Sequence, residues 1–342
     1  MPNPRPIRLG LVGAGGVARL HAQAALSLPA EVDVTAVYDV DPGRAEDLAK
    51  LTGATVHPDH HSLVMNVDAI AVCTPHALHL APALAAARVG VHVLMEKPMA
   101  TTLADCDAMS AACDEAGVVL FLGHIQHYLP MTVAIERAVA AGTVGRPVSI
   151  LDRRATDYRP CQRPAWFFNP ALAGGGAIMN IGAHCIDRVT WIADGRPSRV
   201  SATVVRRDTP VEVEGLLHLE LDNGVLATVS VTTKALADLD EIEVLGTEAT
   251  LRASREGGIR LAHPGGVEQL APPPDVGTDV VVAFRDQLRD FTAAVRHERP
   301  PAVDARVGRD VVATVTAAFA SAASGRQQPV DTCPRPNTPP AP

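Results

Sequence analysis

The sequence predicts two domains: an α/β domain built on a parallel sheet, followed by an α+β domain whose open sheet is mainly antiparallel. Two observations predict this division. Up to residue 125, short apolar runs alternate with segments in which apolar residues recur at helical spacing, as in parallel sheets with crossover helices. Past residue 130 the pattern changes: helix-like segments are followed by strand-like runs, and Asp222-Asn223-Gly224 between two of these runs predicts a tight hairpin turn.

The first domain is assigned to residues 1–125. Its strand-like runs contain few polar residues, as expected for a sheet that is covered on both faces. Strands are predicted over 7–12, 32–38, 69–73, 91–95 and 118–122, and helices over 17–28, 44–51, 78–88 and 103–116.

The second domain is assigned to residues 126–330. Helices are predicted over 131–141, 174–193, 282–296 and 309–324, and strands over 148–153, 199–205, 216–221, 225–232 and 241–245. The last residues, 331–342, are rich in proline and are expected to form a disordered, extended tail.

Length and composition exclude several classes of protein. The 342 residues are enough for two domains that each bury a core, and the net charge of −8 without a long basic run argues against nucleic acid or a membrane surface as a partner. No apolar run reaches the roughly 18 residues of a membrane span, and the N-terminus lacks a signal-peptide layout, so a cytoplasmic protein is expected. The six cysteines show no C-x-x-C pairing, so free thiols and no metal site are expected.

A glycine-rich turn lies between the first predicted strand and the first predicted helix. Gly13-Ala14-Gly15-Gly16-Val17-Ala18 fits the pattern G-x-G-x-x-A. Glycines allow the chain to turn sharply and to approach a pyrophosphate, whose charge then lies at a helix N-terminus. The turn therefore predicts a Rossmann dinucleotide-binding domain in which residues 13–17 contact the cofactor. The alternative is a purely structural glycine turn.

An acidic residue ends the second predicted strand. Asp39 lies about 20 residues beyond the glycine turn, where a carboxylate would accept hydrogen bonds from the ribose hydroxyls of NAD and repel the 2′-phosphate of NADP. The next arginine is Arg44. NAD is therefore expected rather than NADP, and a solvated aspartate is the alternative.

Two further strand ends carry polar residues. Ligands of open parallel sheets bind beyond the carboxyl ends of the strands. Cys73-Thr74-Pro75-His76 follows the third predicted strand, with His79 shortly after, and Glu96-Lys97-Pro98 follows the next strand. A lysine at such an end would point into the cleft, where partial loss of water lowers its pKa toward values useful for proton transfer. The alternative is a surface lysine paired with Glu96.

These residues, from Ile7 to about Val330, resemble the Gfo/Idh/MocA oxidoreductase family, which includes glucose–fructose oxidoreductase and inositol dehydrogenase. The specific part is Glu96-Lys97-Pro98 at its distance from a dinucleotide turn. The motifs that carry the resemblance are Gly13–Ala18, Cys73-Thr74-Pro75 with His79, Glu96-Lys97-Pro98, Gly123-His124 leading to Pro130, and Gly174-Gly175-Gly176 leading to His184 and Asp187.

The resemblance implies an enzyme that moves a hydride between a nicotinamide and an alcohol carbon. Thr74 and Pro75 would line the nicotinamide side, with Cys73, His76 and His79 as further cofactor neighbours. Glu96 and Lys97 would lie near the nicotinamide ribose, Lys97 would also reach the substrate hydroxyl, and its peptide bond to the proline would often be cis. A homodimer or homotetramer is expected as in relatives.

A second candidate pair lies in the predicted helix over 174–193. Asn180 and His184 are four residues apart and so share one helical face. His184 could accept the proton of an alcohol, and the alternative is a histidine that packs inside the domain. The family pattern here is Asp-x-x-x-His, and an asparagine cannot raise the histidine pKa through charge. The hypothesis is that His184 and Lys97 share the proton transfer while Asn180 positions.

Two other histidines follow the predicted strand over 118–122. His127 stands where relatives often carry arginine, so no role is transferred to it. His124 is kept as an expected substrate contact.

Aromatic residues gather before the triple glycine. The chain has eleven, and four of them fall within eleven positions: Tyr158, Trp166, Phe167 and Phe168. Rings stack on the C–H face of a sugar or cyclitol while neighbouring polar groups bond its hydroxyls, so Tyr158, Arg159 and Trp166 are expected to be substrate neighbours. The alternative is that the rings fill an interface between the domains.

The leading hypothesis is an NAD-dependent dehydrogenase that oxidises a ring hydroxyl of a sugar, sugar derivative or inositol. Two alternatives are kept: an NAD-dependent glycoside hydrolase that acts by transient oxidation and elimination, and a non-enzymatic sugar-sensing regulator.

Overall fold

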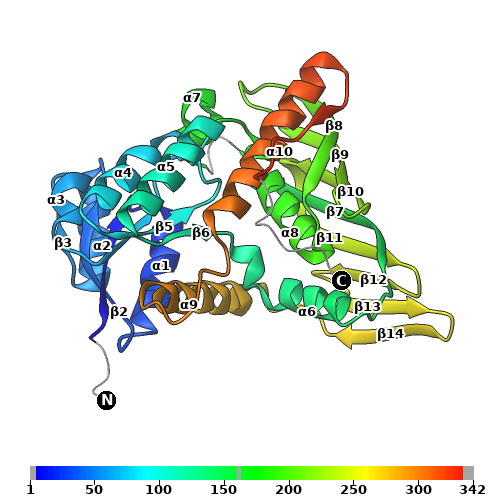
Figure 1. Cartoon of the computed structure of the whole chain (residues 1–342), viewed down its shortest axis with the longest axis horizontal. Helices are drawn as coiled ribbons and strands as arrows, with labels where there is room; N and C mark the ends of the chain where they lie inside the picture. The colour runs from blue at the N-terminus through cyan, green and yellow to red at the C-terminus, as the bar shows by residue number, and fades with distance from the viewer. Residues whose placement is uncertain (1–4, 160–162, 334–342) are drawn as a thin grey trace.

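The computed structural model describes residues 5–159 and 163–333, which fold around two sheets that stand side by side (Figure 1). The predicted fold class is confirmed: the first sheet is parallel and the second is mainly antiparallel. Most of the predicted tail lies outside the described residues. Within the described part of the chain, no helix is both long and apolar enough to cross a membrane.

The first sheet has the strand order β3-β2-β1-β4-β5-β6, so the order reverses beside β1 and creates a crevice at the carboxyl ends of the strands. Its strands are β1 (Ile7–Val12), β2 (Val32–Tyr38), β3 (Thr55–Val56), β4 (Ala69–Val72), β5 (His92–Glu96) and β6 (Leu120–Gly123), and its helices are α1 (Gly16–Leu26), α2 (Pro42–Thr52), α3 (His60–Val64), α4 (Leu80–Arg88) and α5 (Leu103–Ala116). The sequence did not predict β3 and α3, because elements of two and five residues are too short to show a periodicity.

Alternate residues of these strands supply two separate cores. Ile70 and Val72 pack with α3, α4 and α5 on one face, whereas Ala69 and Ala71 pack with α1 and α2 on the other. Both faces of the sheet are therefore covered, which explains its apolar strands.

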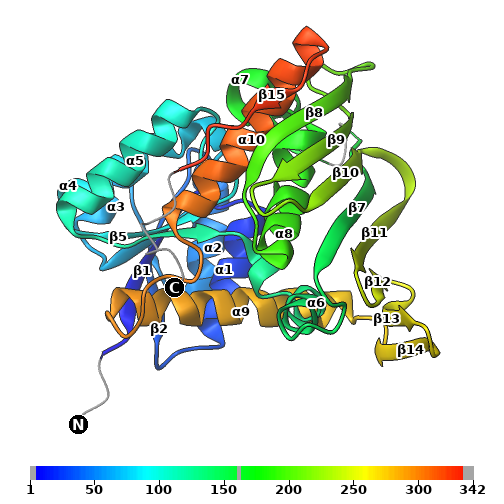
Figure 2. The same ribbon diagram turned by 45° about the vertical axis from the view of Figure 1, so that its right-hand side comes forward.

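Helix α9 (Val276–Val295) comes from the second half of the sequence but completes the core of the first (Figure 2). Phe284, Leu288 and Phe291 join the core that contains α1, and Phe291 meets Phe121 of β6 edge-on, with ring centroids 5.7 Å apart. Each such buried side chain contributes about 1.5–3 kcal/mol. The sequence predicted this helix as an element that closes the second half, because periodicity does not reveal which sheet a helix covers.

The second sheet has the order β14-β13-β12-β11-β7-β10-β9-β8-β15, and only the pair β7–β10 runs parallel among its described strands. The strands are β7 (Pro147–Asp157), β8 (Pro197–Val205), β9 (Glu214–Leu221), β10 (Leu226–Thr232), β11 (Lys234–Gly246), β12 (Thr250–Ser254), β13 (Gly258–His263), β14 (Gly266–Ala271) and β15 (Gln328–Pro329). The predicted turn joins β9 to β10, with Gly224 in the left-handed region at φ +85°.

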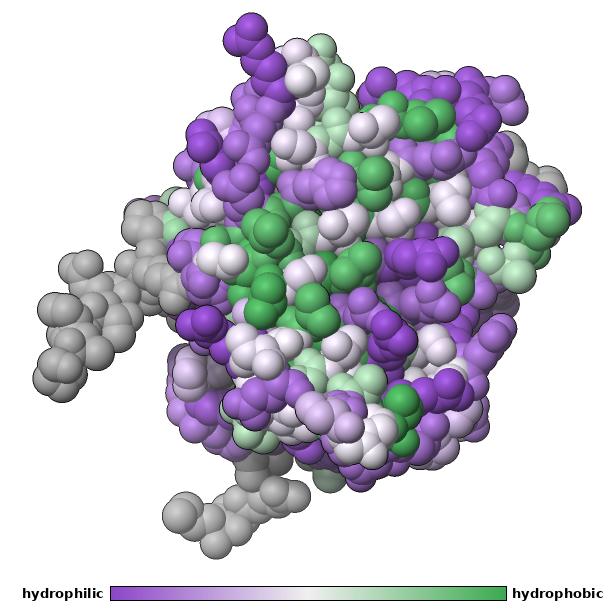
Figure 3. Space-filling view, turned by 90° about the vertical axis from the view of Figure 1, so that its right-hand side faces the viewer, coloured by the Kyte–Doolittle hydropathy of each residue, from purple (hydrophilic) through white to green (hydrophobic). Residues whose placement is uncertain are grey.

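Helices cover one face of this sheet and leave the other open. The covering elements are α6 (Pro130–Ala140), the π-helix η4 (Ile178–Gly182), α8 (Ala183–Ala193) and α10 (Ala305–Ser324). Shorter helices η1 (His76–Leu78), η2 (Ile125–His127), η3 (Ala165–Phe168) and α7 (Pro170–Ala173) lie in the connections. On the open face, Leu151, Leu216, Leu226 and Leu245 are exposed, and Figure 3 shows apolar residues gathered on this side of the molecule.

Candidate active site

A cavity of about 400 Å³ lies between the two halves and is lined by both, a volume typical of small-ligand sites. The first half contributes Val17, Cys73, Thr74, His76, His79, Glu96 and Lys97. The second half contributes Arg154, Ala155, Thr156, Tyr158, Arg163, Trp166, Phe167, Asn180, Ile181, His184, Asp238, Leu239 and Arg255. The structure thus brings most of the sequence-predicted site residues to one place.

The glycine turn has room for a pyrophosphate. Gly13 has φ +94°, and a Cβ there would lie 2.8 Å from the carbonyl of Cys73, so only glycine fits. A Cβ on Gly15 or Gly16 would meet nothing within 4 Å, so open space faces the backbone. Helix α1 begins at Gly16 without a side-chain cap, which leaves its first N–H groups available to an anion. The turn fits a dinucleotide.

Asp39 is fixed against this turn at the end of β2. Its Oδ2 accepts a hydrogen bond from the backbone N–H of Ala14 at 2.6 Å, and its Oδ1 accepts one from the N–H of Asp41 at 2.8 Å. The carboxylate is therefore oriented beside the place where the turn would hold a nucleotide.

The end of β4 is tied to the end of β5 by a buried histidine. The ring nitrogens of His79 lie 3.0 Å from the carbonyl oxygen of Thr74 and 3.2 Å from that of Met99. Burial lowers the pKa of His79, and the two carbonyl oxygens act against this shift. The hydroxyl of Thr74 is buried and has no hydrogen-bond partner within the described chain, so it is available to a ligand.

Glu96 is held by a histidine that the sequence reasoning missed. His21 of α1 is fully buried, and its Nε2 lies 2.8 Å from Glu96 Oε1. Burial acts to raise the pKa of Glu96, but the hydrogen bond and charge of His21 and the charge of Lys97 outweigh it, so the net shift is downward and the carboxylate is ionised. The signal was a histidine on the otherwise apolar face of α1.

Lys97 crosses the cavity to the opposite half. It follows β5, its bond to Pro98 is cis, and its Nζ donates to Asn180 Oδ1 at 2.7 Å and to the Asn180 carbonyl oxygen at 3.0 Å. Because an ammonium group only donates, the amide oxygen must face it, and the Asn180 Nδ2 then donates to the Tyr158 hydroxyl at 3.2 Å. Burial lowers the pKa of Lys97 to about 8, and the charges of Arg154 and Arg163 add to this effect.

A π-helix carries Asn180 into the cavity. It spans Ile178–Gly182 and continues directly into α8, which carries His184, so both side chains line the same wall. Glu212 anchors its start, since its Oε1 accepts hydrogen bonds from the N–H groups of Gly176 and Ile178 at 2.6 and 3.1 Å. The sequence predicted one continuous α-helix here, because a one-residue widening leaves no trace in an apolar pattern.

His184 is neutral, and one of its two ring nitrogens has no hydrogen-bond partner among the described residues. Burial lowers its pKa well below the usual value, and the charges of Lys97 and Arg154 reinforce this. Its Nδ1 is buried without a hydrogen-bond partner among the described residues. Asn180 contacts Lys97 rather than His184, so the amide of Asn180 positions the lysine.

The aromatic cluster both lines the cavity and joins the halves. The ring of Trp166 meets His76 edge-on at 4.9 Å, and Tyr158 meets Phe167 edge-on at 6.0 Å. Phe168 lines a much smaller neighbouring cavity. The sequence left open whether these rings contact substrate or fill the interface between the domains, and their positions are compatible with both roles.

Two residues expected to contact substrate are not among the residues that line the cavity. Arg159 is exposed and pairs with Asp157 at 2.6 Å, and the cavity lining contains Arg163 in its place. His124 is fully buried, with its Nδ1 3.4 Å from Asp187 Oδ2. Arg159 was expected from its place beside the aromatic cluster and His124 from the family resemblance, and neither observation reveals where a side chain points.

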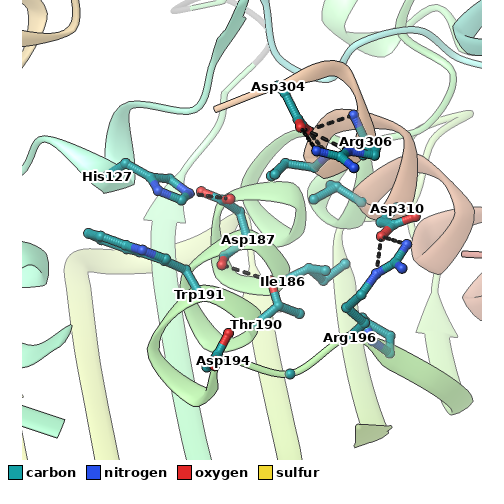
Figure 4. Close-up of a pocket in the computed structure, with 14 residues that line it drawn as sticks. His127, Ile186, Asp187, Thr190, Trp191, Asp194, Arg196, Asp304, Arg306 and Asp310 are labelled. Atoms are coloured by element: carbon teal, nitrogen blue, oxygen red, sulfur yellow. Dashed lines mark hydrogen bonds and ion pairs between the residues drawn. The ribbon is translucent and has the colours of Figure 1, made fainter. Parts of the chain in front are cut away.

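Asp187 also explains His127. Figure 4 shows His127 beside a second cavity of about 370 Å³, where its Nε2 lies 2.9 Å from Asp187 Oδ1 and its ring stacks on Trp191 at 4.1 Å. Burial acts to raise the pKa of Asp187, but the charges of His127 and His124 outweigh this and keep the carboxylate ionised. Position 127 thus serves as a partner for Asp187.

Arg154, Arg255 and Asp238 were missed as site residues. Arg154 belongs to the inward series of β7, which reads Ile150, Asp152, Arg154 and Thr156 at alternate positions. Polar residues on the covered face of a sheet were the available signal. Arg255 and Asp238 had none, because they reach the cavity only when β11 and β12 pair.

Known proteins match both halves. Residues 7–124 match the model described as "Oxidoreductase family, NAD-binding Rossmann fold" (GFO_IDH_MocA), and residues 132–252 match that of the GFO/IDH/MocA C-terminal domain. The 1-carboxy-3-chloro-3,4-dihydroxycyclohexa-1,5-diene dehydrogenase of Comamonas testosteroni is 34% identical over 69% of this chain, which spans only 60% of that protein. Inositol 2-dehydrogenase 1 of Saccharopolyspora erythraea is 31% identical over 85% of this chain and 87% of its own length. The crystal structure of GenD2 from gentamicin A biosynthesis, in complex with NAD, has a TM-score of 0.86 at 25% identity and covers 97% of this chain and 98% of its own.

Proposed function

This chain belongs to the Gfo/Idh/MocA family of oxidoreductases, and on that premise we propose that it is an NAD-dependent dehydrogenase that oxidises a ring hydroxyl of a sugar, sugar derivative or cyclitol. The observation that carries the proposal is the meeting of Lys97, Asn180 and His184 in one cavity that opens beside the glycine turn.

The cofactor would be held by the first half. Residues 13–17 would bind the pyrophosphate, and Asp39 would accept hydrogen bonds from the adenine ribose. Thr74, Pro75 and Glu96 would lie at the nicotinamide end. When bound, the nicotinamide supplies the acceptor or donor of a hydride. The oriented carboxylate of Asp39 supports NAD over NADP, because it would repel a 2′-phosphate.

Lys97 would be the main proton carrier. With a pKa of about 8, it exchanges a proton near neutral pH, whereas an exposed lysine would remain charged. Oxidation requires the neutral amine to accept the hydroxyl proton, and reduction requires the ammonium to return it. The bond to Asn180 fixes the position of Nζ.

His184 would act in its neutral form. Its depressed pKa means that it cannot store a proton at neutral pH, but a ring nitrogen can hydrogen-bond the substrate hydroxyl and orient it. Asn180 would position Lys97 through its side-chain oxygen.

Neither alternative gains support from the relatives. The curated proteins above are named dehydrogenases, and nothing in the cavity favours a hydrolase or a regulator over them. The glycoside hydrolase hypothesis nevertheless sets a useful second outcome for the test.

The test is a panel of sugars, cyclitols and their glycosides, offered with NAD and with NADP and followed at the absorbance of the reduced nicotinamide. We expect reduced NAD to accumulate with at least one free ring polyol and to be lost in Lys97→Met. Release of a free sugar from a glycoside without net reduction would contradict the dehydrogenase and favour the hydrolase.

We also propose that the chain forms a homodimer or homotetramer through the open face of the second sheet. The exposed side chains Leu151, Leu216, Leu226 and Leu245 support this, because such a face is otherwise costly to leave in water. Light scattering would test it, and a monomer at micromolar concentration would contradict it.

A further inference from the structure

The lining of the catalytic cavity carries more positive than negative charge. Its positively charged side chains are Lys97, Arg154, Arg163 and Arg255, and its negatively charged side chains are Glu96 and Asp238. The chain as a whole has a net charge of −8. A positive cavity in an acidic protein raises the local concentration of anions.

Ion pairs offset only part of this charge. Arg255 lies 3.4 Å from Asp238. Arg154 Nε lies 3.5 Å from Asp240, but the same carboxylate is held more closely by Arg188, at 2.8 Å. The Nη1 atom of Arg154 is buried and has no hydrogen-bond partner within the described residues. This guanidinium therefore retains an unused donor at the cavity.

Arg163 is the other arginine with free capacity. Its guanidinium carbon lies 4.1 Å from the ring centroid of Tyr158 and 5.8 Å from that of Phe167. Stacking on a ring leaves the edge N–H groups of a guanidinium available. No ion pair to Arg163 is found within residues 5–159 and 163–333.

We infer that the substrate carries an anionic group, a carboxylate or a phosphate, on the ring whose hydroxyl reacts, and that Arg163 and Arg154 bind this group. The inference rests on the proposed dehydrogenase function. Guanidinium forks match both oxyanions, whereas an uncharged ring would displace water from two arginines and return no charged partner to them.

The first test compares three probes that differ in one substituent: D-glucose, D-glucuronate and D-glucose 6-phosphate. With NAD present, we expect kcat/KM for at least one anionic probe to exceed that for glucose about tenfold or more, since a charged hydrogen bond is worth roughly that factor. The ratio should fall as salt is added. The better of the two anions distinguishes carboxylate from phosphate. Equal or better use of glucose would overturn the inference while leaving the dehydrogenase function intact.

Variants locate the anion. Arg163→Gln and Arg154→Gln should each lower the preference for the anionic probe about tenfold while changing kcat/KM for glucose less. Arg153→Gln is the matched control, because Arg153 is the neighbouring residue of β7, is turned to the outer face and pairs with Glu241 at 3.2 Å. Equal losses for the anionic and neutral probes would overturn the assignment. Arg163→Gln keeps the test decisive if Arg154→Gln fails to fold, since Arg163 is exposed.

A binding measurement separates the two proposals. Titration of the NADH-loaded protein with the same three probes, followed by tryptophan fluorescence, reports the cavity because Trp166 lines it. Tighter, arginine-dependent binding of an anion, with no reduced NAD formed from any member of the sugar and cyclitol panel, would support the anion site at Arg163 and Arg154 and contradict the dehydrogenase function. Equal dissociation constants for the neutral and the anionic probes would overturn the inference whether or not oxidation occurs.

Discussion

The two walls of the catalytic cavity are built in different ways. On the wall from the parallel sheet, the ring of His79 contacts the carbonyl oxygen of Thr74 and that of Met99. Glu96 on the same wall is held by the buried His21. On the opposite wall, Arg154, Asn180 and His184 come from a strand, a π-helix and an α-helix of the second half. The difference indicates that the first wall receives a constant cofactor, whereas the second can be altered residue by residue to receive different substrates.

The strongest test of this comparison is Lys97→Met, because Lys97 belongs to the first wall and acts on the second. We expect kcat to fall about 10³-fold, since general acid–base catalysis contributes roughly 10²–10⁴-fold. NADH binding, measured by fluorescence titration, should remain.

Lys50→Met is the matched control, because Lys50 is exposed on α2 and pairs only weakly with Asp47, at 3.7 Å. A loss of NADH binding equal to the loss of kcat would show that Lys97 serves the cofactor and not the proton.

Substitution of Asn180 tests whether a residue of the second wall positions Lys97 of the first wall through a side-chain hydrogen bond. Asn180→Ala removes the 2.7 Å contact with Lys97 and should lower kcat about 10- to 30-fold, as expected for a hydrogen bond to a charged group. Asn66→Ala is the control, because Asn66 is exposed and its side chain donates to the carbonyl oxygen of Ser62, outside the cavity lining.

Asn180→Asp should change the pH dependence instead. A carboxylate beside Lys97 favours the ammonium form and so raises its pKa above about 8. Because oxidation needs the neutral amine, kcat/KM for oxidation should rise with pH through about 8 in the parent and at a higher pH in the variant. An unchanged profile would contradict the assignment of Lys97 as the titrating group.

Asp39→Asn probes the nucleotide end of the parallel sheet, which lies outside the cavity lining. The substitution keeps the shape but removes the charge, so we expect KM for NAD to rise about tenfold and the preference over NADP to shrink by a similar factor. Asp41→Asn is the control, because asparagine also caps helices and Asp41 caps α2. If NADP gains nothing from Asp39→Asn, the carboxylate does not discriminate between the cofactors.

The smallest effect is expected for Arg159→Gln. The side chain is exposed and pairs with Asp157 outside the cavity, and such surface pairs contribute little. Steady-state kinetics should show less than about a twofold change in kcat/KM. A larger loss would place Arg159 in the substrate site after all and would weaken the assignment of Arg163.

The same comparison explains what the sequence could predict. The site residues of the first half lie in short contiguous motifs, and each motif follows a strand of a regular parallel sheet. Asp39, Thr74 and Lys97 could therefore be placed at strand ends from the order of the elements alone. The second wall is assembled from distant segments. Arg255 and Asp238 meet only after β11 and β12 pair, and no local pattern encodes that register. Arg159 was predicted to face the substrate, whereas the structure places Arg163 in the cavity lining. The direction of these side chains could not be predicted, because a loop has no periodicity.

Helix α9 has a consequence for how the protein is made. Phe284, Leu288 and Phe291 cover α1, yet they follow the glycine turn by most of the length of the chain. Chains fold from the N-terminus as they leave the ribosome, so the nucleotide half emerges long before its last layer exists. The apolar side chains of α1 that face α9 therefore stay uncovered until translation has passed Val295, so the order of synthesis delays completion of this core.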